Sequence, residues 1–361
     1  MTDAFQHFAG TKPIATKHQF DTGALTDWLR PSLGNQLQIL SVEQFKGGQS
    51  NPTYKLITAD RAYVMRAKPA PAAKLLPSAH AIEREFAVMT ALAQVDIPVP
   101  KTYALCEDEA VIGRAFFIME MVDGRVLWDP SLPGATATSR HAIFDEMNRV
   151  IAALHQVNFA AIGLAAYGKA GNFFERQIGR WTKQYRAAET DNIEAMNQLI
   201  TWLPLHIPAG EETSIVHGDF RMDNLIFHPT EARILAILDW ELSTLGNPLA
   251  DFAYHAMAWH VQPDTFRGIA GLDLAALGIP TLQAYVTAYC QRTGRPNGIN
   301  NFDYYLAYNL FRMAGILQGI AKRAADGTAS SDQAVAMGKA ARPFAELGWQ
   351  FAENVMKKNR K

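Results

Sequence analysis

The hydrophobic pattern of this chain changes at Asp123-Gly124, and that change restricts the folds available to it. Five earlier segments have the alternation and the β-branched or aromatic content of strands: LQILSVEQF, TYKLITA, AYVMRA, PVPKTYALCED and AFFIMEMV. Helices are predicted at 21–33, with Asp21 or Thr22 as the N-cap, and at 78–94, with Ser78 as the cap. Residues 1–122 are therefore expected to form a lobe with a five-stranded antiparallel sheet and one long helix.

Helical patterns dominate the rest of the chain, with helices predicted at 139–156, 173–189 and 194–203. A short β section, SIVHGDF, NLIFHP and ARILAILDW, interrupts them, and the chain is predicted to be mostly helical from Leu249 onward. The expected fold class is α+β with two lobes, residues 1–122 and 123–361. A ligand is expected in the cleft between two such lobes.

Composition and charge disfavour several classes of function. Of the 361 residues, 48% are hydrophobic and 19% are charged, so the chain can bury a sizeable core. The formal net charge of −1 disfavours nucleic-acid binding, which needs a basic surface, and fits poorly with a polycationic substrate. No apolar leader or 18-residue apolar span is visible, and the two cysteines show no metal-binding spacing. These features favour a cytoplasmic protein with reduced thiols and no membrane segment.

The segment IVHGDFRMDNLIF, followed by ILDWE, carries the strongest chemical signal. Asn224 lies five residues after Asp219, and Asp239 lies 15 residues after Asn224 at the end of an apolar strand. In phosphoryl transfer one carboxylate orients and deprotonates the attacking hydroxyl, while an amide oxygen and a second carboxylate hold Mg²⁺ against the phosphates. The Asp-to-Asn spacing matches the protein-kinase loop H-R-D-L-x-x-x-N, and Arg221 occupies a position that often supplies a cation to the γ-phosphate. The alternative is that Asp219 and Asn224 only stabilise a turn.

The turn GGQSNP between the first two strands is a second candidate for ligand binding. Gly47 and Gly48 allow backbone N–H groups to approach phosphate oxygens, and Ser50 can donate another hydrogen bond. The same residues are also typical of an ordinary hairpin turn. A nucleotide-binding role for this turn therefore depends on the motif around Asp219.

Together these motifs resemble the aminoglycoside phosphotransferase family. HGDFRMDN with LDWE is similar to the group that also includes choline kinase and homoserine kinase. GGQSNPTY, YVMRAKP, WDPSLPG and LDWELSTLGNPLADFAY more narrowly resemble the phosphotransferase-like domain of acyl-CoA dehydrogenases ten and eleven and its free-standing bacterial relatives. The similarity runs from about Phe45 to His260. It implies a protein-kinase-like fold, with Asp219 as the catalytic base and with Asn224 and Asp239 as Mg²⁺ ligands.

A kinase needs a cation on its third strand for the α- and β-phosphates, and a helix carboxylate that positions this cation. Arg66 and Lys68 share one face of the third strand. The resemblance places the phosphate-binding cation at Arg66, while Lys68 stays an alternative. The resemblance also implies that Glu85 faces inward. Glu83 lies two residues away on the helix, must point in another direction and is interpreted as solvated.

The segment FFIMEMVDG is expected to bind adenine through its backbone. Adenine needs one carbonyl and one N–H from an extended segment. The resemblance assigns these groups to Glu120 and Val122, with Met119 as the gatekeeper. A plain buried strand fits the same pattern, and both interpretations can hold together.

Two further features have two interpretations each. Glu241 shares a face with Asp239 if the chain is extended. One interpretation is that it approaches a second metal or the substrate, and the other is that it makes a structural hydrogen bond. Arg176, Arg180 and Lys183 form a cationic helix face that is either solvated or binds an anionic group of the substrate. Asp251 is expected to cap the helix DFAYHAMAW and, by the resemblance, to brace the catalytic loop.

The sequence therefore predicts a small-molecule kinase that uses ATP or GTP with Mg²⁺ and phosphorylates a hydroxyl group. The resemblance makes a hydroxy acid or a hydroxyacyl-CoA the expected acceptor and implies a functional link to an acyl-CoA dehydrogenase. No nucleic-acid or membrane partner is expected. Two alternatives stay open: a kinase-like module that binds nucleotide without transfer, and a true aminoglycoside phosphotransferase, for which the fold alone is weak support.

Overall fold

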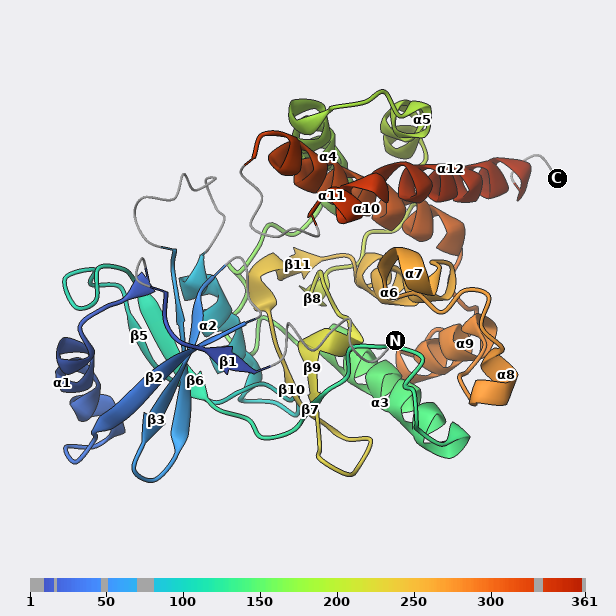
Figure 1. Cartoon of the computed structure of the whole chain (residues 1–361). Helices are drawn as coiled ribbons and strands as arrows, with labels where there is room; N and C mark the ends of the chain where they lie inside the picture. The colour runs from blue at the N-terminus through green and yellow to red at the C-terminus, as the bar shows by residue number, and fades with distance from the viewer. Residues whose placement is uncertain (1–9, 16–17, 47–50, 70–80, 328–333, 359–361) are drawn as a thin grey trace. The chain divides into compact units, whose positions relative to one another are not determined.

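The computed structural model describes residues 10–15, 18–46, 51–69, 81–327 and 334–358 (Figure 1). The chain divides into two compact units, each made of several stretches of sequence. Unit 1 comprises Met1–Trp128, Ala160–Leu164 and Asp223–Leu242, and unit 2 comprises Asp129–Phe159, Ala165–Met222 and Ser243–Lys361. The stretch Asp223–Leu242 therefore folds with the N-terminal part of the chain rather than with its sequence neighbours.

Unit 1 is built around a six-stranded antiparallel sheet with the order β1-β2-β3-β4-β6-β5. Its strands are β1 (Thr11–Lys12), β2 (Ile39–Phe45), β3 (Thr53–Thr58), β4 (Ala62–Ala67), β5 (Thr102–Cys106) and β6 (Phe116–Glu120). The five longer strands confirm the sequence prediction. The sixth, β1, pairs Thr11 with Phe45 at the sheet edge. Its two residues are too few to show strand alternation, which is why the sequence did not predict it.

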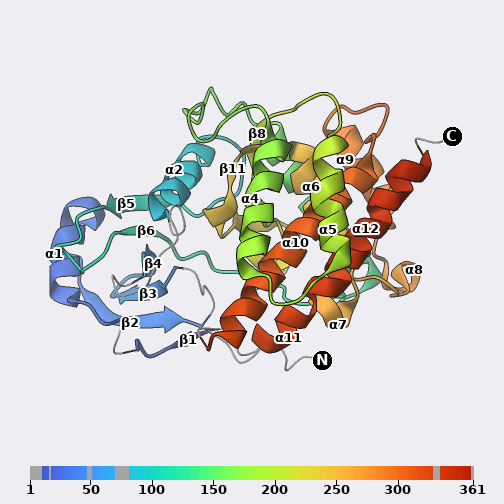
Figure 2. The same cartoon turned by 90° about the horizontal axis from the view of Figure 1, so that it is seen from above.

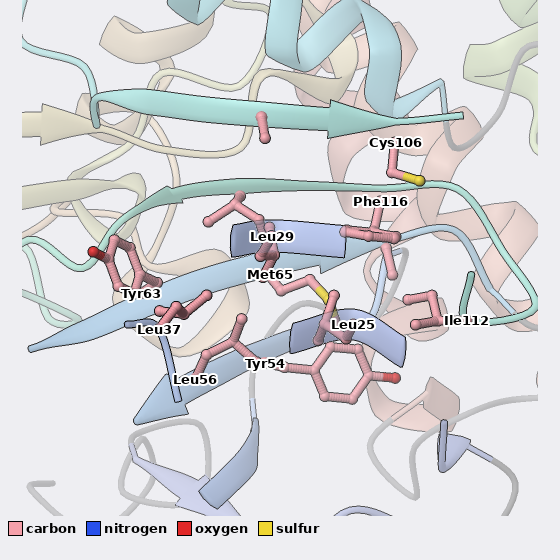
Figure 3. Packing of buried hydrophobic residues seen from close by; sticks show 13 residues of the cluster. Leu25, Leu29, Leu37, Tyr54, Leu56, Tyr63, Met65, Cys106, Ile112 and Phe116 are labelled. Carbon is pink, nitrogen blue, oxygen red and sulfur yellow. The ribbon is translucent and has the colours of Figure 1, made fainter. Parts of the chain in front are cut away.

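Helix α1 (Thr22–Leu33) covers one face of this sheet. It begins as the sequence predicts, because the Asp21 carboxylate accepts hydrogen bonds from two backbone N–H groups of the first turn at 2.8 and 3.0 Å. Leu25 and Leu29 are fully buried and belong to the same apolar cluster as the strand residue Met65 (Figure 3). This cluster forms the core of unit 1 on the α1 side.

Helix α2 (Ile82–Leu92) covers the opposite face. Successive side chains of a strand point to opposite faces, so Arg66 points away from the cluster around Met65 and toward α2, where it contacts Glu85. The described helix begins later than predicted, without a side-chain cap, and Ser78 lies outside the described residues. The position of Arg66 on the α2 face is what makes it available for the candidate site.

A second sheet of unit 1 has the order β10-β9-β7 and is formed by β7 (Arg125–Val126), β9 (Leu225–Phe227) and β10 (Ile234–Ile237). In the antiparallel β9–β10 hairpin, Leu225 lies opposite Ile237. The hairpin therefore brings the residue before β9 close to the residues after β10.

Unit 2 is mostly helical, as the sequence predicts. Its 24-residue helix α10 (Phe302–Ala325) packs against α4, α6, α11 and α12, and Figure 2 shows α4, α5, α10 and α12 side by side. The other helices are α3 (Ala137–His155), α4 (Phe173–Ala188), α5 (Glu194–Trp202), α6 (Pro248–Ala256), α7 (Pro263–Phe266), α8 (Leu274–Leu277), α9 (Leu282–Arg292), α11 (Ala334–Lys339) and α12 (Ala341–Lys358). Strands β8 (Ser214–Val216) and β11 (Thr244–Gly246) form a short antiparallel pair. Short 3₁₀ turns occupy Leu203–Leu205, Met222–Asn224, Trp240–Leu242 and Met257–Trp259.

Helix α6 begins three residues before Asp251, so the expectation that Asp251 is its N-cap is wrong. The cap is Asn247, whose side chain accepts a hydrogen bond from the N–H of Leu249 at 2.9 Å. Pro248 occupies the first turn, where a missing N–H leaves no bond unmade. Asp251 therefore lies inside the helix, and its carboxylate is used elsewhere.

Cys106 and Cys290 are buried free thiols, as expected. Burial raises the pKa of both, so they stay protonated near neutral pH. No helix in the described part of the chain combines the length and the apolar character needed to cross a membrane.

Candidate active site

The β9–β10 hairpin places two oxygen-bearing side chains close together in unit 1. Asn224 directly precedes β9, and Asp239 follows β10 by two residues. The N–H of Leu238 donates to the carbonyl of Asn224 at 2.8 Å, which continues the antiparallel pairing beyond the strand ends. Asn224 is buried, whereas the Asp239 side chain is 34% exposed. Two residues that are far apart in sequence thus become neighbours because the hairpin folds back on itself.

Asp239 adopts a left-handed backbone conformation, with φ of 64°. Aspartate tolerates this region better than most residues because its short side chain can make local hydrogen bonds. The conformation directs the carboxylate to Arg66, whose Nη2 lies 2.7 Å from Oδ1. Such strained residues occur more often at functional sites.

Arg66 of β4 is surrounded by carboxylates. Its Nε lies 2.9 Å from Oε2 of Glu85, and its Nη2 lies 3.7 Å from Oε2 of Glu241, in addition to the contact with Asp239. Burial lowers the pKa of Arg66, but the charges of these three residues outweigh burial and raise the pKa above its ordinary value. Asn51 donates to Oε1 of Glu85 at 3.0 Å, the oxygen that also accepts from Nε of Arg66 at 3.1 Å. The site therefore contains a buried guanidinium that stays charged at every physiological pH.

Glu85 is buried, and burial raises its pKa even though Arg66 opposes this effect. Lys68 instead forms an ion pair with Glu83, and each of these two side chains is about 30% exposed. Glu83 is therefore engaged in an ion pair on the α2 face rather than being simply solvated. The structure separates a buried pair, Arg66 with Glu85, from a partly exposed pair, Lys68 with Glu83.

The candidate adenine-binding segment follows β6. The N–H of Glu120 donates to the carbonyl of Lys101 at 2.8 Å. Within the described residues, no hydrogen bond to the backbone of Val122 is formed. Met119 is buried. Gly47, Gly48 and Ser50 lie outside the described residues.

The loop His217–Arg221 follows β8 in unit 2 and carries Asp219. Gly218 has φ of 80°, a conformation that costs glycine little and other residues more. The N–H of Asp219 donates to Nδ1 of His217 at 3.1 Å, and Nε of Arg221 lies 3.1 Å from Oδ1 of Asp219. The loop therefore turns sharply and pairs its carboxylate with its own arginine.

Asp251 braces this loop, a role that the sequence analysis inferred from the resemblance. Its two carboxylate oxygens accept the N–H groups of His217 and Gly218, each at 2.8 Å. His155 contacts the same carboxylate through Nε2 at 3.2 Å and Tyr289 through Nδ1 at 2.8 Å. Burial raises the pKa of Asp251, but the hydrogen bond and charge of His155 outweigh it and lower the pKa below its usual value. Asp251 is therefore a buried anion that holds the backbone of the loop.

Two further side chains hold the loop, and the sequence analysis did not identify either. Nδ1 of His255 lies 3.2 Å from the carbonyl of Phe220, and its Nε2 lies 2.7 Å from the hydroxyl of Tyr285. A carbonyl only accepts, so Nδ1 carries the proton and Nε2 accepts from the tyrosine. Arg312 donates from Nη2 to the carbonyl of Gly218 at 2.6 Å. His255 could have been found from sequence, because it follows Asp251 by one helical turn, whereas Arg312 gave no such signal.

Cations are concentrated near Asp219 in unit 2. Burial and, next, the charge of Arg221 lower the pKa of the Arg267 guanidinium to about 10, although the charge of Asp219 opposes both. Two arginines belong to the cationic face predicted on α4. Arg176 donates to the carbonyl of Lys169 at 2.6 Å, and the guanidinium of Arg180 lies 5.5 Å from the centre of the Trp181 ring. These α4 arginines therefore have local partners within their own unit.

The donor atoms in unit 1 suit a hard cation. Asn224 and Asp239 offer an amide oxygen and a carboxylate, and Mg²⁺ prefers such oxygen ligands. No group of three His, Cys, Asp or Glu side chains with metal-binding geometry occurs among the described residues. A cation at this position would therefore take its remaining ligands from phosphate oxygens and water, as Mg²⁺ does in nucleotide-dependent enzymes.

These features agree with the comparisons to known proteins. The chain belongs to the phosphotransferase enzyme family (APH), whose model matches residues 41–296. It is therefore an enzyme of the phosphotransferase class with a kinase-like fold.

Individual proteins are similar to this chain to different degrees. The chain is 48% identical over 346 residues to acyl-CoA dehydrogenase family member 10 of Mus musculus, and this match covers 95% of the chain but only 32% of that protein. A crystal structure of a Ralstonia eutropha protein assigned to the aminoglycoside phosphotransferases is 61% identical, with a TM-score of 0.85 over 93% of this chain and 99% of that one. A thermostable mutant of the aminoglycoside phosphotransferase APH(4)-Ia, solved as a ternary complex with AMP-PNP and hygromycin B, shares the fold, with a TM-score of 0.60, 15% identity and coverage of 91% of this chain and 98% of that one. The chain thus spans about a third of the curated relative that it matches.

Proposed function

We propose that this chain is a small-molecule kinase that transfers the γ-phosphate of ATP to a hydroxyl group. The observation that carries the proposal is the β9–β10 hairpin, which brings Asn224 and Asp239 together beside the Arg66–Glu85 pair. A cation, a helix carboxylate and two oxygen ligands are the parts that phosphoryl transfer requires around a nucleotide. A purely structural role would not need a buried arginine with three acidic neighbours.

In this proposal the two lobes expected from the sequence, residues 1–122 and 123–361, contribute different residues. Residues 1–122 bind the nucleotide: the backbone of Glu120 and Val122 recognises the base, and the turn with Gly47, Gly48 and Ser50 approaches the phosphates. Arg66, positioned by Glu85, binds the α- and β-phosphates. Residues 123–361 carry the metal ligands, the catalytic loop and the acceptor site.

Asn224 and Asp239 would hold Mg²⁺, which supplies charge neutralisation to the phosphates when bound. The oxygen of the acceptor hydroxyl bonds to the γ-phosphorus, and Asp219 accepts the proton that this hydroxyl loses. The bond from that phosphorus to the bridging oxygen breaks, and ADP leaves with the electron pair. Arg221 neutralises charge on the phosphoryl group in transit.

The acceptor proposed here is a hydroxy acid or a hydroxyacyl-CoA. The relatives named as acyl-CoA dehydrogenase family members support this choice, as does the concentration of Arg221 and Arg267 near Asp219. An anionic acceptor would be attracted by these arginines, whereas a polycationic aminoglycoside would be repelled. A functional link to an acyl-CoA dehydrogenase follows from the same reasoning. GTP is the alternative phosphate donor, because recognition through backbone groups alone does not exclude guanine.

The decisive test is Asp219→Asn. The asparagine still forms hydrogen bonds but takes no proton, so kcat should fall by about 10²–10⁴-fold while the Kd for ATP stays near that of the wild type. Asn224→Ala is the matched variant, and it should lose metal-dependent nucleotide binding as well. Steady-state turnover and calorimetric titration of ATP measure both quantities. Near-wild-type turnover of Asp219→Asn would instead favour a nucleotide-binding module without a catalytic base.

A second experiment addresses the acceptor. Phosphate transfer from ATP and from GTP would be measured to hydroxy acids, hydroxyacyl-CoAs, sugars and aminoglycosides. The proposal expects the highest kcat/KM for an anionic acceptor. A higher kcat/KM for an aminoglycoside would contradict this expectation and favour a true aminoglycoside phosphotransferase.

A further inference from the structure

Tyr254 lies on α6 one helical turn after Asp251, and it is buried. Its hydroxyl donates a hydrogen bond to Oδ1 of Asp219. The direction is fixed by chemistry, because an ionised carboxylate only accepts. Burial, and next the negative charge of Asp219, raise the pKa of Tyr254, so the phenol stays a donor throughout the working range of the enzyme.

Arg312 of α10 holds the ring of this tyrosine. Its guanidinium lies 5.0 Å from the centre of the Tyr254 ring and 5.5 Å from the centre of the Trp181 ring. Cations bind favourably over aromatic faces, and more strongly where water is excluded. Arg312 also donates to the carbonyl of Gly218 at 2.6 Å. One side chain thus fixes both the tyrosine ring and the backbone beside Asp219.

One hydrogen-bond donor and one positive charge converge on the same oxygen of Asp219. Oδ1 receives the Tyr254 hydroxyl and lies 3.1 Å from Nε of Arg221. The hydrogen bond and the nearby positive charge both stabilise the negative charge on Oδ1, which makes Oδ1 the weaker proton acceptor of the two carboxylate oxygens. The arrangement also fixes the rotation of the carboxylate, which otherwise turns freely about its terminal bond.

We propose that Tyr254 is a positioning residue for phosphoryl transfer: it anchors Oδ1 of Asp219, so that Oδ2 receives the proton of the acceptor hydroxyl. This inference rests on the proposed function, since it assigns a role within the same reaction. Tyr254 acts through Asp219 and touches neither the nucleotide nor the metal ligands in this account.

Tyr254→Phe removes the hydroxyl and keeps the ring under Arg312. We expect kcat to fall by about 10–100-fold, because a misplaced catalytic group costs this much in rate. The KM for ATP and the melting temperature should stay near their wild-type values. Tyr305→Phe is the matched control: it removes a hydroxyl from another buried tyrosine of unit 2 and should leave kcat unchanged.

A double-mutant cycle separates positioning from a structural role. If Tyr254 acts through Asp219, Tyr254→Phe should lower single-turnover rates in the wild type but not further in the Asp219→Asn variant. Equal losses in both backgrounds, or an unchanged kcat of Tyr254→Phe, would overturn the inference. Full turnover of Asp219→Asn alone would overturn the proposed function as well, so the two failures are distinguishable.

Discussion

At the scale of single residues, burial distinguishes Arg66 from Lys68, the two cations that the sequence leaves as alternatives. Both Arg66 and Lys68 point to the α2 face, yet only Arg66 is buried and paired with Glu85 and Asp239. Lys68 forms a partly exposed pair with Glu83, and such pairs contribute little to stability. A cation that already borders the candidate metal ligands is the better placed of the two to bind phosphate.

We therefore expect Arg66→Ala to weaken ATP binding more than Lys68→Ala does. Loss of a charge-assisted contact to phosphate costs about 1.5–3 kcal/mol, or about 10–100-fold in Kd. Calorimetric titration of ATP with Mg²⁺ into both variants measures the difference. The reverse order would transfer the phosphate-binding role to Lys68.

His255 predicts a pH dependence of stability. Burial lowers its pKa from 6.5 to about 4, and the hydrogen bond to Phe220 only partly opposes this. Above pH 6.5 the imidazole is neutral in both folded and unfolded chains. Between pH 6.5 and 4 the unfolded chain takes up a proton that the folded chain does not, so stability falls by about 3 kcal/mol as the pH falls.

The measurement is urea unfolding from pH 7 to pH 4 for the wild type and His255→Gln. The unfolding free energy of the variant should decrease less over this window than that of the wild type, because Gln does not titrate. Exposed His141→Gln is the control and should reproduce the wild-type slope. Burial also lowers the pKa of His260, so this residue adds to the loss of stability over the same window, and the difference between variants, not the absolute curve, is informative.

The site residues named from the sequence have the spacing of a kinase loop, and the residues missed are those that reach the loop through helix packing. Asp219, Asn224 and Asp239 follow spacings that a kinase loop imposes on the chain. Arg312 contacts Gly218 across 94 positions of sequence, and Tyr254 reaches Asp219 across 35. Contacts of this kind arise from helix packing, which leaves no local pattern to read.

At the scale of elements, the order of strands and helices was predictable and their ends were not. Strand alternation and helical spacing extend over whole segments, so five strands of the main sheet and the helices α3, α4 and α5 were expected. The ends of a helix or strand, by contrast, depend on single side chains. Asn247 followed by Pro248 starts α6 earlier than the polar residue Asp251 suggested.

This difference at α6 leads to a paired prediction. Asp251→Asn should destabilise the protein by about 2–4 kcal/mol and lower kcat, because an amide replaces a buried carboxylate that accepts two loop N–H groups. Asn247→Ala should cost about 1 kcal/mol, the usual value of a lost cap, and retain most activity. Thermal unfolding and turnover of both variants test the assignment. A larger loss for Asn247→Ala would return the bracing role to the cap.

At the scale of the whole molecule, ligand binding should be visible as stability. A ligand that binds only the folded chain at 100 times its Kd stabilises it by about 2.7 kcal/mol. We expect ATP with Mg²⁺ to raise the melting temperature and ATP with excess chelator to raise it less. Asp239→Asn should remove the difference between the two conditions. An identical shift with and without chelator, or full activity in chelator, would contradict a metal role for Asn224 and Asp239.

The discontinuity of unit 1 has a consequence for how the chain is made. A ribosome releases the stretch with Arg66 and Glu85 early, but the β9–β10 hairpin with Asn224 and Asp239 only after the first two stretches of unit 2 are complete. At about 5–20 residues per second, synthesis from residue 129 to residue 242 takes on the order of 10 s. Throughout that interval the nascent unit 1 lacks its second sheet, and Arg66 lacks two of its three acidic partners. A messenger truncated between the codons for Glu85 and Asp239 therefore encodes a chain with an arginine for phosphate but without the complete pair of proposed metal ligands.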